Sequence, residues 1–291
     1  ISGYTCGDLF YQDLLLEGCL DSLESIRRSS TRKDMLIVVG LPLKHNSKLY
    51  NVACFINKGK ILGFVPKTYI PNYNEFYESR YFAPAFKGNT KVVIRGNEYP
   101  FGVNLLFKCK SVSDLVVAGE ICEDLWVPSS PSINHALNGA TVICNLSASN
   151  EVVGKDKLRL DLVKFTSRKL CCAYLYSSAG EGESTQDLVF SSHHIIAENG
   201  VILSESPQFV NEIIYSEIDM DRIISERRKN TSFQPLEDSN EAIRIPFSLD
   251  IEETTLTRKI EAMPFVPSNL QDRENRCEEI LTIQAMGLKK R

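Results

Sequence analysis

One cysteine stands at the end of an apolar run, in the sequence LVVAGEICEDLW of residues 115–126. This residue, Cys122, is flanked by three acids, Glu120, Glu123 and Asp124. Carboxylates beside a thiol raise its pKa and make it a poorer nucleophile, unless a cation is held close by. A catalytic role for Cys122 therefore requires a basic side chain from elsewhere in the chain.

Lys67 is the candidate cation, in the sequence ILGFVPKTYIPNYNEFYESRYF of residues 61–82. It follows an apolar run and Pro66, as a lysine at the end of a buried strand does. Beside Cys122, its ammonium would favour the thiolate and, with the backbone N–H after the cysteine, stabilise the oxyanion formed on attack at a carbonyl carbon. We expect the two residues to end neighbouring strands, where α/β enzymes place their chemistry.

These segments, with three further blocks in the same order, resemble the nitrilase superfamily and, within it, the glutaminase domains of glutamine-dependent NAD synthetases. The further blocks are ISGYTCGDLF, then NLSASNEVVGK with SSAGEGESTQDLVFSSHHIIAENG, and finally PFVPSN with RCEEILTIQAMGLKKR. The superfamily uses a Glu–Lys–Cys triad. The resemblance implies that Cys122 is the nucleophile and Lys67 the triad lysine. It also implies an auxiliary acid that orients the lysine, either Glu75 or Glu78, of which we favour Glu78.

The resemblance further implies which residues line a glutamine pocket. Glu123 and Ser149 are expected to face the α-amino end of the substrate, and Lys155 its carboxylate. Lys155 offers a point charge where relatives can have arginine, so its hold on a carboxylate is not bidentate. The full expected set is Tyr73, Glu123, Trp126, Ser149 and Lys155.

The triad glutamate lies, on this resemblance, just upstream of the stretch that matches ISGY. We therefore expect this glutamate in the full-length protein and not among residues 1–291. Without it, these residues would lack general-base catalysis, which is worth about 10²–10⁴-fold in rate. The reaction implied is glutamine hydrolysis through a thioester, without a cofactor. The ammonia would pass to a fused synthetase domain, absent here, that uses ATP and Mg to amidate deamido-NAD.

The fold implied is α/β, a four-layer α-β-β-α sandwich truncated at both ends, with a C-terminal extended arm and helix. The spacing of apolar residues predicts helices in residues 8–30 and 154–170, and hairpins that turn near Lys58 and Asn199. A last strand is predicted over residues 212–219. The expected divisions are a glutaminase domain (1–224), a Pro-punctuated linker (225–269) and a linker helix (270–291).

The composition narrows the classes of function. A net charge of −4 argues against a nucleic-acid partner, and no apolar run reaches the roughly 20 residues of a membrane span. Nine cysteines without CxxC pairs indicate a reducing, cytoplasmic location. Four histidines, two of them adjacent on a strand, predict no metal site. Long polar helices of this fold class favour a homo-oligomer.

Three alternatives remain. A free-standing nitrilase-type amidase or carbamoylase would not need the C-terminal arm. A catalytically inactive scaffold of the same fold would have a non-acidic residue at the triad position upstream of Ile1. A papain-like Cys–His enzyme is disfavoured, because no histidine stands at a predicted strand end.

Overall fold

The computed structural model describes the chain except residues 184–186, 237–241, 252–253, 261–262, 264–265, 268 and 290–291. The chain divides into two compact units, Ile1–Thr254 and Thr255–Arg291. The second unit contains one helix, α5 (Leu270–Lys289). No helix among the described residues is both long and apolar enough to cross a bilayer.

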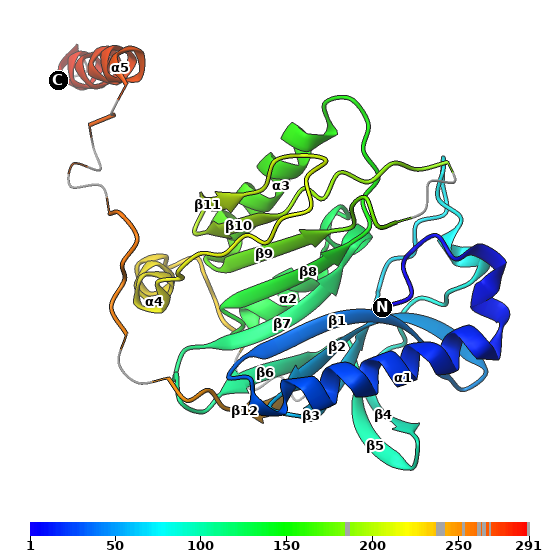
Figure 1. Ribbon diagram of the computed structural model, residues 1–291. Coiled ribbons are helices and arrows are strands. Elements are labelled where there is room, and N and C mark those ends of the chain that lie inside the picture. The colour runs from blue at the N-terminus through cyan, green and yellow to red at the C-terminus, as the bar shows by residue number, and fades with distance from the viewer. Residues whose placement is uncertain are drawn as a thin grey trace. The chain divides into compact units, whose positions relative to one another are not determined.

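Two β-sheets form the middle of the first unit (Figure 1). The five-stranded sheet has the order β1-β2-β3-β5-β4. Its strands are β1 (Leu36–His45), β2 (Lys48–Asn57), β3 (Lys60–Pro66), β4 (Asn89–Ile94) and β5 (Asn97–Gly102). The predicted hairpin is present, because β2 and β3 pair antiparallel across a turn in which Lys58 and Gly59 take positive φ angles.

The seven-stranded sheet has the order β11-β10-β9-β8-β7-β6-β12, with β7, β8 and β9 parallel at its centre. Its strands are β6 (Leu105–Cys109), β7 (Val116–Ile121), β8 (Val142–Ser147), β9 (Ala173–Ser178), β10 (Ile195–Glu198), β11 (Val201–Glu205) and β12 (Ile243–Phe247). The second predicted hairpin is β10–β11. Continuous burial along β7 explains its mainly apolar sequence, which only Glu120 interrupts with a charge.

Helices cover the outer faces of both sheets, which gives four layers (Figure 1). On the five-stranded sheet lies α1 (Asp13–Ser29), whose Leu23 packs with the buried residues of that sheet. On the seven-stranded sheet lie α2 (Pro131–Leu137) and α3 (Lys155–Leu170), the latter through Val163 and Leu170. The predicted fold class, a nitrilase-type α-β-β-α sandwich, is confirmed.

The two sheets pack through a shared apolar core. Phe55 of the first sheet stacks on Phe107 of the second, with ring centroids 3.8 Å apart. A Cβ added at Gly119 of β7 would lie 2.9 Å from the Phe55 ring, closer than real Cβ contacts come. Glycine at this position therefore sets how closely the sheets approach.

The C-terminal part of the first unit differs from the prediction. The strand expected over residues 212–219 is wrong, since the backbone there forms no ladder and leads into α4 (Met220–Lys229). The apolar residues that suggested a strand, such as Ile213 and Tyr215, are exposed.

The unit also extends beyond the predicted limit of residue 224, which falls inside α4. Ile223 is buried, and Arg227 donates to the carbonyl oxygens of Ala140, Leu170 and Cys171. Further on, β12 pairs in parallel with β6. Part of the expected linker, including residues 237–241, lies outside the described residues.

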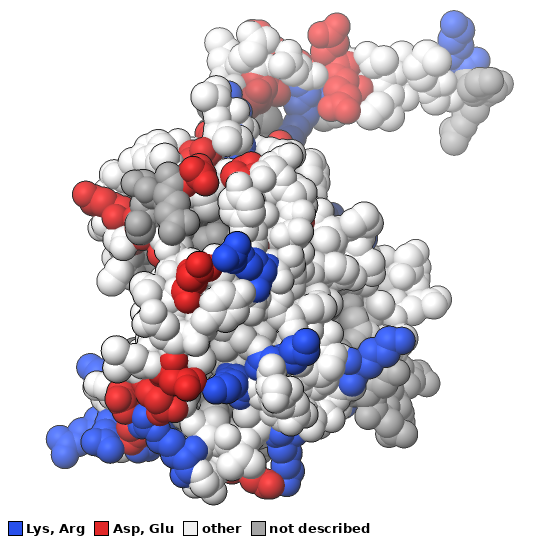
Figure 2. Space-filling view, turned by 90° about the vertical axis from the view of Figure 1, so that its right-hand side faces the viewer, with Lys and Arg blue, Asp and Glu red and all other residues white. Residues whose placement is uncertain are grey.

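Charged side chains are mixed on the face shown in Figure 2, where basic and acidic residues alternate around a broad area of other residues. Opposite charges also pair directly in the structure: Arg95 pairs with Glu17 and Asp21, and Arg27 pairs with Glu24. Such mixing is typical of a solvated protein surface.

Gly119→Val should lower the free energy of unfolding by about 1–3 kcal/mol, because the added carbons meet the Phe55 ring between the sheets. Urea denaturation measures the change. The control is Gly18→Ala on the exposed side of α1, where an added Cβ meets no atom within 4 Å; it should leave the stability unchanged or raise it. Parent-like stability of Gly119→Val would contradict the close sheet packing.

Candidate active site

The backbone turns sharply at Cys122, where β7 ends at Ile121 and a 3-10 helix, η4 (Cys122–Leu125), begins. Cys122 has φ of 48°, a left-handed conformation that costs a non-glycine residue on the order of 1–3 kcal/mol. Two side chains hold the turn. The Ile121 N–H donates to Asp124 (2.9 Å), and the Cys122 N–H donates to Oδ1 of Asn145 (3.1 Å). The thiol is thereby fixed at the end of its strand.

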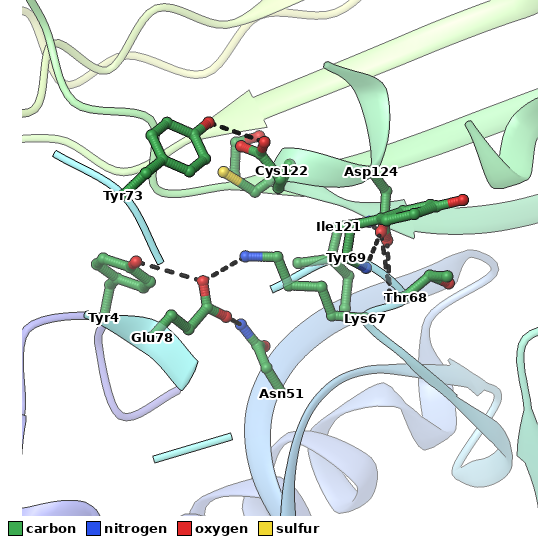
Figure 3. Close-up of polar contacts among 12 residues, drawn as sticks. Tyr4, Asn51, Lys67, Thr68, Tyr69, Tyr73, Glu78, Ile121, Cys122 and Asp124 are labelled. Carbon is green, nitrogen blue, oxygen red and sulfur yellow. Dashed lines mark hydrogen bonds and ion pairs between the residues drawn. The ribbon is translucent and has the colours of Figure 1, made fainter. Parts of the chain in front are cut away.

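Lys67 follows β3 and forms a buried ion pair with Glu78 (Figure 3). Both side chains are 1% exposed. The Glu78 carboxylate also accepts from Nδ2 of Asn51 (3.0 Å) and from the Tyr4 hydroxyl (3.3 Å). Three donors therefore fix the acid that holds the lysine.

The charge of Lys67 is retained despite its burial. Burial by itself lowers the pKa of Lys67, but the adjacent Glu78 and Cys122 act in the opposite direction, and the net pKa is raised. Lys67 and Cys122 line one cavity of about 310 Å³. The Lys67 ammonium therefore shares one cavity with the Cys122 thiol, the arrangement expected for a cysteine nucleophile.

The three acids around Cys122 each have another partner. Glu123 accepts from the Tyr73 hydroxyl (2.8 Å). Glu120 accepts from the Ser132 N–H (2.8 Å) and from the Tyr174 hydroxyl, deep in the seven-stranded sheet.

Asp124 accepts backbone N–H groups, from Tyr69 (2.8 Å) as well as Ile121. Burial raises the pKa of Asp124 to about 7. Each of the three acids that lie near Cys122 in the sequence therefore accepts hydrogen bonds from donors of its own.

A second cavity, of about 390 Å³, is also lined by Cys122. Its lining contains Cys122 and all five residues expected from the sequence to contact substrate, namely Tyr73, Glu123, Trp126, Ser149 and Lys155. The structure therefore brings the predicted catalytic and substrate-binding residues together around one thiol.

Lys155 is the basic group of this second cavity. Its ammonium donates to Oδ1 of Asn150 and lies 5.4 Å from the centre of the Trp126 ring and 5.8 Å from that of Phe76. Partial burial lowers the pKa of Lys155. Glu123, with an acidic side chain, lines the same cavity. Glu75 is a second acid in the lining, so the cavity offers a ligand groups of both charges.

Comparison with known proteins gives the family. Residues 1–228 match the family described as carbon-nitrogen hydrolase. The chain belongs to the carbon-nitrogen hydrolase family. The nitrilase resemblance predicted from the sequence is confirmed.

Two named relatives are similar to this carbon-nitrogen hydrolase chain. A glutamine-dependent NAD(+) synthetase of Mycobacterium bovis is 38% identical over 300 residues, which cover 100% of this chain and 44% of that protein. One of Rattus norvegicus is 30% identical over 246 residues, covering 80% of this chain and 33% of that protein. The chain spans less than half the length of the curated relatives it matches.

Solved structures share the fold. The crystal structure of a glutamine-dependent NAD(+) synthetase from Cytophaga hutchinsonii matches with a TM-score of 0.62 and 29% identity, over 71% of this chain and 33% of that one. Nit3 of Saccharomyces cerevisiae, a member of the nitrilase superfamily, matches with a TM-score of 0.56 and 20% identity, over 73% and 70% of the two chains. The second likeness concerns the fold alone.

The sheets overturn one expectation about this carbon-nitrogen hydrolase site, and the contacts of Glu75 and Glu78 differ. Lys67 and Cys122 do not end neighbouring strands, because β3 and β7 belong to the two facing sheets. The prediction of adjacent strands was wrong because a sequence does not show which strands share a sheet. Of the two candidate acids, Glu78 contacts Lys67, whereas Glu75 accepts from Asn150.

Sequence reasoning missed three residues that hold the site, Tyr4, Asn51 and Asn145. Tyr4 lies in the GYT stretch, 74 positions from its partner Glu78, and Asn51 lies inside a strand. Only a polar residue within an otherwise apolar strand could have drawn attention to Asn51 or Asn145.

Histidine and metal chemistry find no support among the described residues. None of the residues lining either cavity is a histidine. His193 instead lies between Arg159 and Glu205, with hydrogen bonds of 2.8 Å to each. Within the described part of the chain, no three His, Cys, Asp or Glu side chains gather as metal ligands.

Glu78→Gln should lower the free energy of unfolding by about 3 kcal/mol or more, because it leaves the Lys67 ammonium buried without its counter-charge. Urea denaturation at neutral pH measures the loss. The matched control is Glu98→Gln at the exposed pair with Lys91, which should leave stability nearly unchanged. Equal small effects of the two substitutions would contradict a buried, charged pair.

Proposed function

We propose that this chain is the glutamine-hydrolysing part of an NAD synthetase. It converts glutamine to glutamate and ammonia through a thioester on Cys122. The ammonia passes to a synthetase region that uses ATP and Mg to amidate deamido-NAD. The names of the full-coverage relatives support the substrate and the synthetase partner, and the family match supports hydrolysis of a carbon–nitrogen bond.

The observation that carries the proposal is the position of Cys122 between two unlike cavities. Cys122 lines both. Lys67, which pairs with Glu78, borders one of them, and the Lys155 and Glu123 side chains border the other. A thiol beside a fixed ammonium, at the end of a pocket with opposite charges, fits an amide substrate that carries both an ammonium and a carboxylate.

Glutamine has both of those groups at its α-carbon. In the proposed complex its carboxylate lies at Lys155, and its α-amino group lies at Glu123 and Ser149. Tyr73 and Trp126 flank the aliphatic part of the substrate. The side-chain amide then reaches Cys122. The length of the substrate therefore decides whether its amide carbon meets the thiol.

The proposed reaction begins when the Cys122 thiolate adds to the amide carbon. The carbonyl oxygen becomes an oxyanion, which the Lys67 ammonium stabilises. When the tetrahedral intermediate collapses, the C–N bond breaks, and the nitrogen takes the former thiol proton and leaves as ammonia. Water then cleaves the γ-glutamyl thioester to give glutamate. We assign the proton transfers to the glutamate that the resemblance places upstream of Ile1.

Cys122→Ala should abolish glutamine-dependent NAD formation by at least about 10³-fold, because it removes the nucleophile. Synthesis supplied with ammonium salt should continue at the parent rate. The experiment uses the protein that contains both this chain and the synthetase region, with NAD and glutamate measured together.

The control is Cys277→Ala, which removes an exposed thiol of α5 and should leave both rates unchanged. Equal loss of the glutamine-dependent and ammonia-dependent rates in the Cys122→Ala protein would contradict the proposed division of labour. Unchanged glutamine hydrolysis would contradict Cys122 as the nucleophile.

A further inference from the structure

The Asp124 carboxylate lies between the two catalytic segments and bonds to both of them (Figure 3). Its Oδ1 atom accepts from the backbone N–H of Tyr69 at 2.8 Å and from that of Thr68 at 3.1 Å. Its Oδ2 atom accepts from the backbone N–H of Ile121 at 2.9 Å and, at the longer distance of 3.3 Å, from that of Thr68. The shortest bond to the segment that follows Lys67 therefore goes to one oxygen, and the bond to the residue that precedes Cys122 goes to the other.

This bridge joins two sheets that have no ladder in common. Lys67 follows β3 of the five-stranded sheet, and Cys122 follows β7 of the seven-stranded sheet. Hydrogen-bond ladders fix the relative positions of residues within one sheet. Between the two sheets, apolar packing alone fixes the relative positions of residues less closely. A buried carboxylate with directional bonds to both strand ends supplies the missing constraint.

The bonds are protected from water. Asp124 is 1% exposed, and Lys67 beside it is also 1% exposed. Above its pKa of about 7 Asp124 is ionised, and hydrogen bonds to an ionised acceptor in such surroundings are roughly twice as strong as neutral ones. The Cys122 conformation, with φ of 48°, needs such support to persist.

We infer that Asp124 is a positioning residue for the thiol-dependent reaction, setting the separation of the Lys67 ammonium from the Cys122 thiol. This inference rests on the proposed function. Asp124 contacts backbone N–H groups and acts through the two segments that it joins. The carboxylate form is required, because two acceptor oxygens must serve two segments.

The test is Asp124→Asn, which keeps size but replaces one acceptor oxygen with an NH₂ group. If the amide oxygen takes the place of Oδ2, it keeps the bond from Ile121 and at most the 3.3 Å bond from Thr68, and the NH₂ group then points a donor at the Tyr69 N–H. We expect kcat for glutamine hydrolysis to fall about 10–100-fold, since a displacement of about 1 Å at a reacting group can cost about 10²-fold. KM should change less than about threefold, because the pocket around Trp126 and Lys155 is untouched.

The matched control is Asp219→Asn, at an aspartate that also accepts a backbone N–H, from Arg222 at 2.9 Å, but at the start of α4. It should leave kcat and KM at parent values. A second readout is the pH profile of alkylation of Cys122 by iodoacetamide. Loss of the Asp124 negative charge would by itself shift this profile to lower pH. A shift to higher pH in Asp124→Asn, towards that of Lys67→Met, is therefore the expected sign of a displaced Lys67 ammonium, whereas general loosening would speed alkylation at every pH.

Asp124→Glu keeps both acceptors on a side chain one methylene longer, so it serves if the asparagine variant does not fold. Its kcat should fall about 3–10-fold with KM retained. Parent kcat in folded Asp124→Asn, or in Asp124→Glu if only that variant folds, would overturn the inference. If Cys122→Ala protein still hydrolyses glutamine, the proposed function itself fails, so the two failures are distinguishable.

Discussion

The structure around the thiol depends on keeping one lysine charged inside the protein. Moving an ammonium out of water costs several kcal/mol, and only a fixed counter-charge offsets that cost. Glu78 supplies the charge, and the Asn51 amide and the Tyr4 hydroxyl hold Glu78 in place. These partners come from well-separated parts of the chain, so the ion pair forms only when the first unit is folded.

The same constraint explains why the site lies where two sheets meet. Burial of Lys67 requires protein on both sides, and the facing ends of β3 and β7 provide it. Gly119, three residues before the thiol, lets the sheets approach closely. At the strand end, Asp124 and Asn145 then hold a backbone turn that the local sequence would not adopt by itself.

The sequence predicted much of this arrangement, and its failures have physical causes. The mainly apolar runs of β7 and β8 and the turn residues at Lys58 and Asn199 are local signals, so the strands and hairpins were predictable. Pairing between distant strands is not local, and the placement of Lys67 and Cys122 on different sheets was therefore missed. The segment 212–219 has strand-like residues but no partner strand, so its tertiary surroundings overrode its local preference.

The reaction proposed for Cys122 passes through a γ-glutamyl thioester on this residue. Rapid quenching of the protein during turnover of glutamine, followed by peptide mapping, tests for it most directly. A γ-glutamyl group attached to the peptide that contains Cys122, appearing within one turnover and lost as glutamate forms, is the predicted result. Turnover of glutamine with this peptide unmodified at every time point, or with the glutamyl group on a different cysteine, would contradict the account.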